Sequence, residues 1–519
     1  MIPVIDLFAG PGGLNEGFSS IGEDSGAPVF STAASFEMDL YAYQTLLLRG
    51  IYRKLVRGGV VPKCYYDFVS GMTTWEEFVA EEVIQPLLQQ ALREAHQIEL
   101  GPSNRGIVDA KIRAALAEAR GSSGSPWVLI GGPPCQAYSL AGRSRRTNDK
   151  DFEKDKKHFL YREYLHIIEE FEPSIFVMEN VKGLLSSTHD GSKMFEMILG
   201  DLSNPKEGLE YEVRSLVVAG KPRDLRPKDF VVRSEDYGVP QKRHRLILVG
   251  VRKDLAPKAG YPALAKSAEV SVRDAISDLP AIRSVISTVS QDGWDEWKAI
   301  HRAALRSLRL REPFGGSIGR PKILGVGGRF VPGYPLGGSL TEYQEWVRDS
   351  ALTGFTLHEA RRHMANDLKR YAYLAALAAN SGRNPSLTDL PPELQPAHMN
   401  VGRPDTPFTD RFRVQLWDSP STTVVSHIAK DGHYYIHPDP VQMRSLTVRE
   451  AARLQSFPDN YFFRGTRTQQ YSQVGNAVPP LLARKIALVV AEMLKDIQLA
   501  DEAELSDSEI GEPVLAGSI

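Results

Sequence analysis

The sequence predicts an α/β fold in which a Rossmann-like, mostly parallel sheet carries an inserted smaller, loop-rich domain. Residues 127–130 and 175–178 are short apolar runs, typical of strands buried on both faces of a parallel sheet. A glycine-rich turn follows a third apolar run near the start of the chain. Beyond residue 251 the alternation of strands and helices stops, and residues 313–338 contain nine glycines. A chain of 519 residues is also too long for one small core.

The elements follow in order along the chain. Residues 4–8 predict a strand, followed by a glycine turn at 9–13 and a helix to about residue 18. Residues 35–37 and 65–68 are interpreted as the ends of the next two strands, and residues 73–119 as helices. A helix at 161–171 leads into the strand at 175–178, and a later strand covers 246–249. Sheet-domain character returns with helices at 447–455 and 479–494.

These elements divide the chain into domains. The first part of the sheet domain is expected at 1–254, with a helical insertion at 70–125. The second domain is expected at 255–425, and the chain returns to the sheet domain at 426–498. An acidic tail at 499–519 contains six acids and no Lys or Arg after residue 500, so it is expected to be disordered.

Composition describes an ordinary globular protein, with 42% hydrophobic and 24% charged residues. Without the six acids of the tail, the net charge of −2 becomes +4, which only weakly suggests nucleic-acid binding. Cys64 and Cys135 are the only cysteines, which favours a reducing, cytoplasmic environment over a disulfide framework. No apolar stretch is long enough to span a bilayer, and the first residues do not resemble a signal peptide. No membrane association is therefore expected.

Two chemically active residues follow the two apolar runs. Cys135 comes just after the first run, in a turn stiffened by Pro133 and Pro134, and Glu179 ends the second. Ligands of parallel sheets bind beyond the carboxyl ends of the strands, so these residues are expected to form a nucleophile and acid pair. A free cysteine is more often a buried apolar filler, but the diproline turn favours an outward position. No metal site is expected, because no C-x-x-C or H-x-x-x-H spacing accompanies the cysteine.

Two further groups of residues point to ligands. The glycine turn, together with Glu37 and Asp67 at the expected strand ends, suits an adenosine ligand rather than a dinucleotide, since G-x-G-x-x-G is absent. Strand alternation places Gln241, Arg243 and Arg245 on one face, where two guanidinium groups suit a phosphate or a carbonyl oxygen. An ordinary tight turn and a solvated basic edge strand are the alternatives.

Taken in order, these motifs resemble the cytosine-C5 DNA methyltransferases. The resemblance covers about half of the chain and rests on residues 6–10, 134–136, 179–181, 241–245, 444–458 and 473–479. It implies that Cys135 attacks C6 of cytosine, that Glu179 protonates N3, that Arg245 holds O2 and that Arg243 supports the site. It also implies transfer of a methyl group from S-adenosyl-L-methionine to C5. The cofactor-binding residues implied are Phe8, Gly10, Pro11, Gly13, Leu14, Glu37, Met38, Asp67, Phe68, Pro134, Leu160, Asn476 and Ala477.

The same resemblance implies a double-stranded DNA substrate with a flipped target base. Residues 137–159 fit a mobile loop, residues 255–425 fit a target-recognition domain, and the expected DNA-binding residues are Gln136, Ser139, Arg143 and Thr423. A monomer is expected, in the prokaryotic cytoplasm near the nucleoid. A restriction-modification system and a solitary modification enzyme both stay open, and with them a cognate restriction endonuclease as partner.

Three alternatives are less consistent with the residues. The tRNA-directed branch of the superfamily carries a small recognition region and a Cys-Phe-Thr signature, which this chain lacks. A non-catalytic relative should have lost Cys135, Glu179 or Arg245, and all three are present. Methyltransferases that act on exocyclic amino groups carry an Asp/Asn-Pro-Pro-aromatic tetrapeptide, where this chain has Gly-Pro-Pro-Cys at 132–135.

Overall fold

The computed structural model describes residues 1–22, 27–120, 125–134, 160–189, 192–221, 224–287, 292–309, 323–333, 340–396 and 411–510. The helices are α1 (Gly13–Ser19), α2 (Leu40–Arg57), α3 (Lys63–Ser70), α4 (Trp75–Ala80), α5 (Gln85–Glu94), α6 (Arg105–Arg120), α8 (Leu160–Phe171), α9 (Met194–Ser203), α10 (Val272–Ile276), α11 (Trp294–Arg309), α12 (Glu342–Val347), α13 (Ala365–Ser381), α14 (Val448–Leu454), α15 (Arg467–Asn476) and α16 (Pro480–Ile510). The strands are β1 (Ile2–Leu7), β2 (Phe30–Glu37), β3 (Ala95–Gln97), β4 (Val128–Gly131), β5 (Ile175–Val181), β6 (Thr188–His189), β7 (Ser192–Lys193), β8 (Tyr211–Arg214), β9 (Val231–Arg233), β10 (Gln241–Lys242), β11 (His244–Arg252), β12 (Val285–Ile286), β13 (Gly327–Pro332), β14 (Gly354–Glu359), β15 (Arg362–His363) and β16 (Ser421–Thr422).

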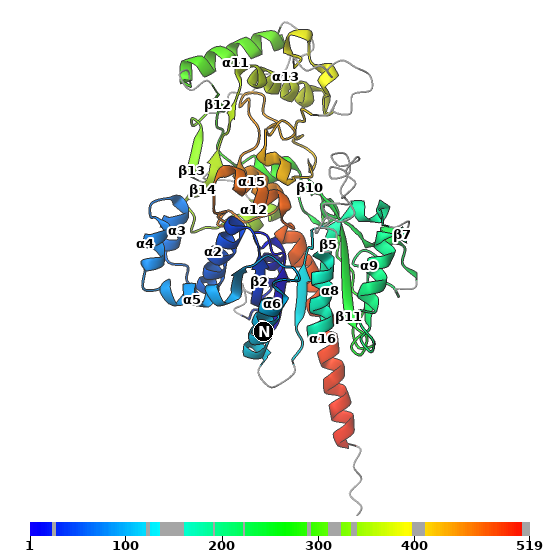
Figure 1. Cartoon of the computed structure of the whole chain (residues 1–519). Coiled ribbons are helices and arrows are strands. Elements are labelled where there is room, and N and C mark those ends of the chain that lie inside the picture. Colours follow the sequence, from blue (N-terminus) through cyan, green and yellow to red (C-terminus); the bar gives the residue numbers. More distant parts are fainter. Residues whose placement is uncertain are drawn as a thin grey trace, which may run out of the picture.

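A central sheet of mixed, mostly parallel strands organises the lower part of the molecule in Figure 1, and the predicted fold class is confirmed. Its order is β3-β2-β1-β4-β5-β11-β8, with β9 pairing with β11. The first five strands run parallel, whereas β11 is antiparallel to β5. The carboxyl ends of β1 to β5 therefore share one edge with the amino end of β11. That edge faces the part of the chain that lies above the sheet in Figure 1.

Strand alternation explains why these strands are apolar on both faces. Leu129 of β4, with Phe176 and Met178 of β5, packs in a cluster that contains α6, α8 and α9. Val128 and Val177 point to the opposite face, into a cluster with α1 and α16. Because helices cover both faces, both sets of positions must be apolar. The continuous apolar runs in the sequence follow directly from this sandwich.

The segment between β2 and β4 differs from the prediction. Residues 65–68 do not end a strand, because they lie within helix α3. Tyr65, Phe68 and Val69 are buried at helical spacing, and Gly71 ends the helix with φ +83°. The third strand of the sheet is instead β3, within the segment 70–125 that was expected to be a helical insertion. Helices α3 to α5 precede β3 and pack with α2 in one apolar cluster, and α6 connects β3 to β4.

The predicted helix at 447–455 forms α14 and lies at a junction of buried charges. Arg453 forms ion pairs with Asp459 at 2.7 Å and with Asp278 at 2.5 Å. Arg444, just before the helix, binds both carboxylate oxygens of Glu450 at 2.6 and 2.7 Å. Burial alone would raise the pKa of Glu450, but the Arg444 guanidinium holds it well below its usual range. The Arg453–Asp278 ion pair ties residues 270–280 to the final part of the chain.

Residues 255–425 contain more helix than the loop-rich expectation, chiefly α11 and α13, which lie at the top of Figure 1. Their small cores are built around Trp297 and Tyr371. Val272 in α10 and Phe355 in β14, however, belong to the same cluster as α2 and α14. The lower part of this segment therefore shares a core with residues assigned to the sheet domain, and the boundary at 255 stays a prediction.

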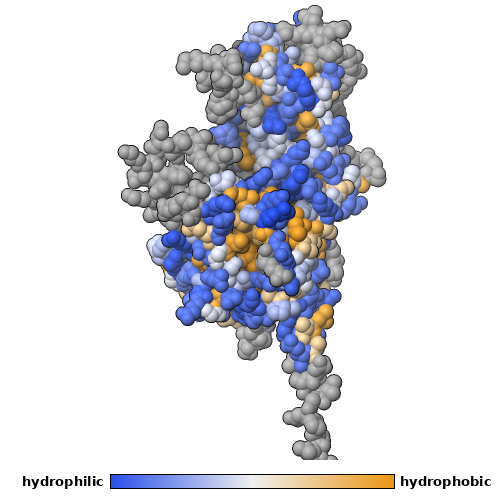
Figure 2. Space-filling model, turned by 90° about the vertical axis from the view of Figure 1, so that its right-hand side faces the viewer, coloured by the Kyte–Doolittle hydropathy of each residue, from blue (hydrophilic) through white to orange (hydrophobic). Residues whose placement is uncertain are grey.

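Helix α16 is longer than predicted and projects away from the body in Figure 1. The expectation of disorder is wrong for residues 499–510, which continue this helix, while residues 511–519 lie outside the described part of the chain. Lys258 binds Asp501 and Glu504 at 2.6 Å each, which anchors the acidic turns. Figure 2 shows apolar residues on the projecting helix and a larger apolar area on the body. Within the described ranges, no helix is long and apolar enough to span a bilayer.

Candidate active site

A cavity of about 1210 Å³ opens at the carboxyl edge of the sheet. It is lined by the ends of β1, β2, β4 and β5, the start of β11, and residues from α15 and the segment 425–430. This is the location that the topology of a parallel sheet favours for ligands. Of the residues predicted for catalysis or cofactor binding, those that line it are Phe8, Gly10, Pro11, Leu14, Glu37, Met38, Pro134, Leu160, Glu179, Arg243, Arg245, Asn476 and Ala477.

The glycine turn forms one wall. Gly10 has φ +56°, and a Cβ there would meet nothing within 4 Å, so this backbone faces open space. Its N–H donates to Glu37 Oε2 at 2.8 Å, while Asp39 N–H donates to Glu37 Oε1 at 2.8 Å. Burial raises the pKa of Glu37 despite these bonds. Glu37 therefore ties the turn to β2 and presents its carboxyl group to the cavity.

Asp6 lies deeper in the same wall. Its side chain is buried, and among the described residues Oδ2 has no hydrogen-bond partner. Burial raises the pKa of Asp6 well above its usual range, and the nearby positive charge of Arg53 offsets this only in part. A buried carboxyl group without a partner, in the wall of a cavity, can accept a hydrogen bond from a polar ligand or donate one to it.

Glu179 and Arg245 form an ion pair across β5 and β11, with Arg245 Nε 2.8 Å from Glu179 Oε1. The register explains the contact: Ile247 is opposite Glu179 in the antiparallel pair, and Arg245 is two residues away on the same face. Both side chains are largely buried yet line the cavity. The pair can bind a planar polar group that takes a hydrogen bond or proton from Glu179 and, beside it, a hydrogen bond from the Arg245 guanidinium.

The end of β4 reaches the same point. A Cβ at Gly132 would lie 3.1 Å from Glu179 Oε2, so the absence of a side chain lets this backbone approach the carboxyl group. Asn180 Nδ2 donates to Pro133 O at 3.3 Å, which ties the diproline turn to the end of β5. The turn that precedes Cys135 is thereby held beside Glu179.

Arg243 and Gln241 hold the surrounding backbone. Arg243 donates to Val424 O at 2.9 Å and to Gly475 O at 3.3 Å, and Gln241 Oε1 accepts from Val424 N–H at 2.7 Å. Burial lowers the pKa of Arg243 to about 9, with the neighbouring Arg245 as a further cause. Thr423 does not line the cavity, and its hydroxyl donates to Lys242 O at 2.6 Å. These residues join residues 241–245, residues 423–424 and α15 into one frame.

Some predicted site residues lie elsewhere. Asp67 forms an ion pair with Lys63 on the surface of α3, and Phe68 packs in the cluster between α3 and α4, so neither lines the cavity. Gly13 is buried, and a Cβ there would lie 2.2 Å from Val478 O, which makes it a packing position. Cys135, Gln136, Ser139 and Arg143 lie outside the described residues.

Sequence reasoning missed the segment after β3. Ile98, Glu99 and Leu100 line the cavity next to the end of β2, where Asp67 was expected. The available signal was an acid between two apolar residues, followed by Gly101 and Pro102 before a helix. On α15, Thr468, Gln469 and Ser472 also line the cavity.

Known proteins resemble this chain in sequence and in fold. Residues 123–492 match the family model of C-5 cytosine-specific DNA methylases. The type II methyltransferase M.Bpa9945I of Bacillus paralicheniformis is 34% identical over 507 residues, covering 95% of this chain and 99% of the relative. The type II methyltransferase M.AgeI of Thalassovita gelatinovora is 30% identical, covering 73% and 85%. A solved prophage-encoded protein of Escherichia coli, described as a DNA modification methyltransferase, superposes with TM-score 0.50 and 19% identity over 95% of this chain and 100% of its own.

Proposed function

The chain belongs to the C-5 cytosine-specific DNA methylase family, and from this premise we propose which residues carry out the reaction. The protein is a DNA (cytosine-5-)-methyltransferase that uses S-adenosyl-L-methionine. The observation that carries the assignment of residues is the Glu179–Arg245 pair beside the diproline turn, which lines the same cavity as the glycine loop.

The cavity residues fit the cofactor. Open space next to Gly10, the carboxyl group of Glu37 and the unsatisfied Asp6 provide close backbone approach and acceptors for hydroxyl and amino groups. Glu99 takes the place that the sequence assigned to Asp67, as the acid for the adenine amino group. When bound, S-adenosyl-L-methionine supplies an electrophilic methyl group.

The remaining chemistry belongs to the side chains. The Cys135 thiolate adds to C6 of the flipped cytosine, and Glu179 gives a proton to N3 as charge builds on the ring. C5 thereby becomes nucleophilic and can be methylated. Loss of the C5 proton to water, return of the N3 proton to Glu179 and elimination of the thiolate restore the aromatic ring. Arg245, held by Glu179, donates to the cytosine O2, and Arg243 acts as a positioning residue through the backbone of Val424 and Gly475.

The biological setting is the second part of the proposal. Relatives named type II methyltransferases align over nearly the whole chain, which supports a modification enzyme of a type II restriction-modification system with a cognate endonuclease. We propose that it acts as a monomer on double-stranded DNA in the bacterial cytoplasm, near the nucleoid. Residues 255–425 are proposed to recognise the target sequence, with Gln136, Ser139, Arg143 and Thr423 contacting DNA.

Trapping with a mechanism-based substrate tests the assignment of the nucleophile. Sequencing of DNA from expressing cells first identifies the methylated site, and duplex DNA with 5-fluorocytosine at that site should then form a denaturant-stable adduct. The adduct should be lost in Cys135→Ser and kept in Cys64→Ser, a matched control because Cys64 is the other cysteine and lies in α3. An adduct that survives Cys135→Ser would contradict this mechanism.

A further inference from the structure

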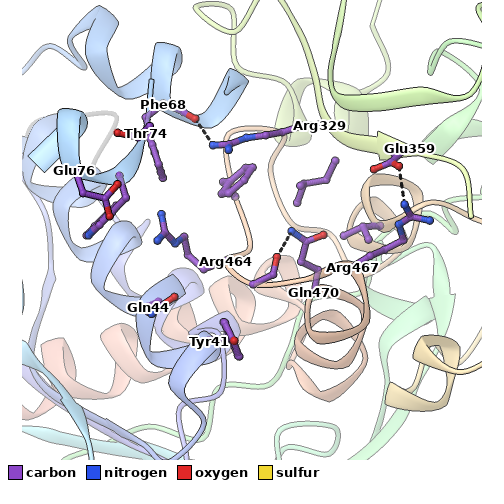
Figure 3. A pocket seen from close by; sticks show the side chains of 15 residues that line it. Tyr41, Gln44, Phe68, Thr74, Glu76, Arg329, Glu359, Arg464, Arg467 and Gln470 are labelled. Carbon is purple, nitrogen blue, oxygen red and sulfur yellow. Dashed lines mark hydrogen bonds and ion pairs between the residues drawn. The ribbon is translucent and has the colours of Figure 1, made fainter. Parts of the chain in front are cut away.

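A second cavity, of about 660 Å³, lies on the other side of α15 (Figure 3). Arg467 and Gln470 of this helix line it, whereas Thr468, Gln469 and Ser472 line the active-site cavity. Its other walls come from α3, α4, β13, β14 and the start of α2. Of the residues proposed for methyl transfer, none that the structure describes lines this second cavity.

Two arginines point into the second cavity from opposite sides (Figure 3). The Arg464 guanidinium lies over the rings of Trp75 and Phe68, at 4.5 and 5.3 Å from their centroids. Arg329 lies over Phe68 and Phe462, at 5.4 and 4.8 Å. Stacking on aromatic faces fixes the orientation of a guanidinium group and leaves its N–H edge available.

Neither arginine forms an ion pair within the described part of the chain, unlike Arg467, which binds Glu359 at 2.6 Å. Arg329 uses one guanidinium N–H for Phe68 O, at the end of α3, and its side chain passes over Gly71, where a Cβ would approach it to 2.9 Å. Partial burial lowers the pKa of Arg464, the positive charge of Arg329 adds to this effect, and the negative charge of Glu76 opposes it. Two like charges are therefore held close together with donors to spare, and an anion between them would relieve their repulsion.

We propose that this second cavity binds a nucleoside monophosphate, with its phosphate between Arg329 and Arg464 and its base against the aromatic side chains. A guanidinium fork matches phosphate oxygens, and the partly exposed rings of Tyr41 and Trp75, which line the same cavity, can contact a planar base. Exposed Glu76 lies at the rim, where it disfavours ligands with more negative charge. The site is separate from the proposed catalytic residues, so a test of one proposal does not decide the other.

The position of the second cavity connects it to cofactor binding. Tyr41 and Gln44 of α2 line it, while Ala42 of the same helix lines the active-site cavity. Helix α15 is likewise shared by both. A ligand that orders these two helices should also change the affinity for the cofactor, because coupling between two sites is reciprocal.

Calorimetric titration of the full-length protein tests the site. Saturating S-adenosylhomocysteine blocks the active-site cavity, and thymidine 5′-monophosphate is the probe, with thymidine and inorganic phosphate as partial ligands. The monophosphate should bind at least about tenfold more tightly than thymidine, since charge-assisted bonds carry the affinity. Arg464→Gln should weaken its binding about tenfold or more, and Arg464→Lys less. Arg113→Gln, an exposed arginine that lines neither cavity, should leave it unchanged.

The affinity of Arg464→Gln for S-adenosylhomocysteine, measured without nucleotide, checks that this variant is folded. If the affinity differs from that of the wild type, Arg329→Gln is used in place of Arg464→Gln. Equal affinity of the monophosphate for the wild type and the variant would overturn the proposal, as would the absence of binding at millimolar concentration. The affinity of wild type and Arg464→Gln for a non-specific DNA duplex is measured as a further comparison. If Arg464→Gln weakens the duplex but not the monophosphate, the arginines contact the DNA backbone and the proposal is wrong.

Discussion

Replacing Glu99 by Gln should weaken cofactor binding, whereas replacing Asp67 by Asn should not. The sequence predicts Asp67 as the acid at the end of the third strand. In the structure the third strand is β3, and Glu99, which follows it, lines the active-site cavity. Asp67 lies in α3, where both its carboxylate oxygens bind Lys63, at 2.6 and 2.7 Å. The two substitutions are chemically matched, since each removes one charge and keeps most of the shape.

The structure sets the expected magnitudes. A hydrogen bond to a charged group contributes roughly 1.5–3 kcal/mol, and the exposed position of Glu99 places its bond to an adenine amino group at the lower end. A loss of about 1.5 kcal/mol corresponds to about a tenfold higher Kd. Asp67 belongs to an exposed i,i+4 pair, whose loss should reduce the free energy of unfolding by only about 0.3–0.5 kcal/mol.

Titration calorimetry with S-adenosylhomocysteine measures both variants directly, and thermal unfolding reports their stability. The purine analogue of the same ligand, which lacks the adenine amino group, sharpens the test. Wild type should prefer the natural base about tenfold, and Glu99→Gln should reduce that preference, because its amide oxygen accepts a hydrogen bond without a negative charge. If Asp67→Asn weakens binding as much as Glu99→Gln, or if both bind like wild type, the reassignment of the acid from α3 to the end of β3 is refuted.

Two further predictions concern catalysis and stability. Glu179→Gln should lower the single-turnover methylation rate by ~10²–10⁴-fold, the usual contribution of general acid catalysis, with DNA and cofactor affinity within a few-fold of wild type; a loss carried wholly by DNA binding would contradict this role. His358 is buried, with its ring nitrogens bonded to Thr447 and Pro280, and burial lowers its pKa to about 4. Its stabilising effect is therefore complete above the unfolded pKa of about 6.5 and decreases as the pH falls toward 4, by about 2 kcal/mol at pH 5. Between pH 7 and pH 5, urea unfolding should show a smaller decrease in the free energy of unfolding for His358→Gln than for wild type. An equal decrease would show that other groups control the acid sensitivity.

The sequence by itself determined the fold class and most of the catalytic edge. Strands β4 and β5 were predictable because helices cover both faces of the sheet, so their apolar runs are uninterrupted and their polar ends stand out. Glu37, Glu179 and Arg245 follow from that pattern, since each lies at the end or start of such a run. The family resemblance added their roles, because motif order carries chemical information that strand patterns lack.

Only the tertiary structure decided which acid follows the third strand, and which residues support the site from a distance. Strand β3 has three residues and lies between helices, so no periodicity marks it, while the aromatic run around Phe68 imitates a strand and is in fact the buried face of α3. The partners of Arg243 are backbone carbonyls 181 and 232 residues away. The two arginines of the second cavity are 135 positions apart in the sequence. Contacts of this kind depend on how whole layers pack, and local sequence does not encode them.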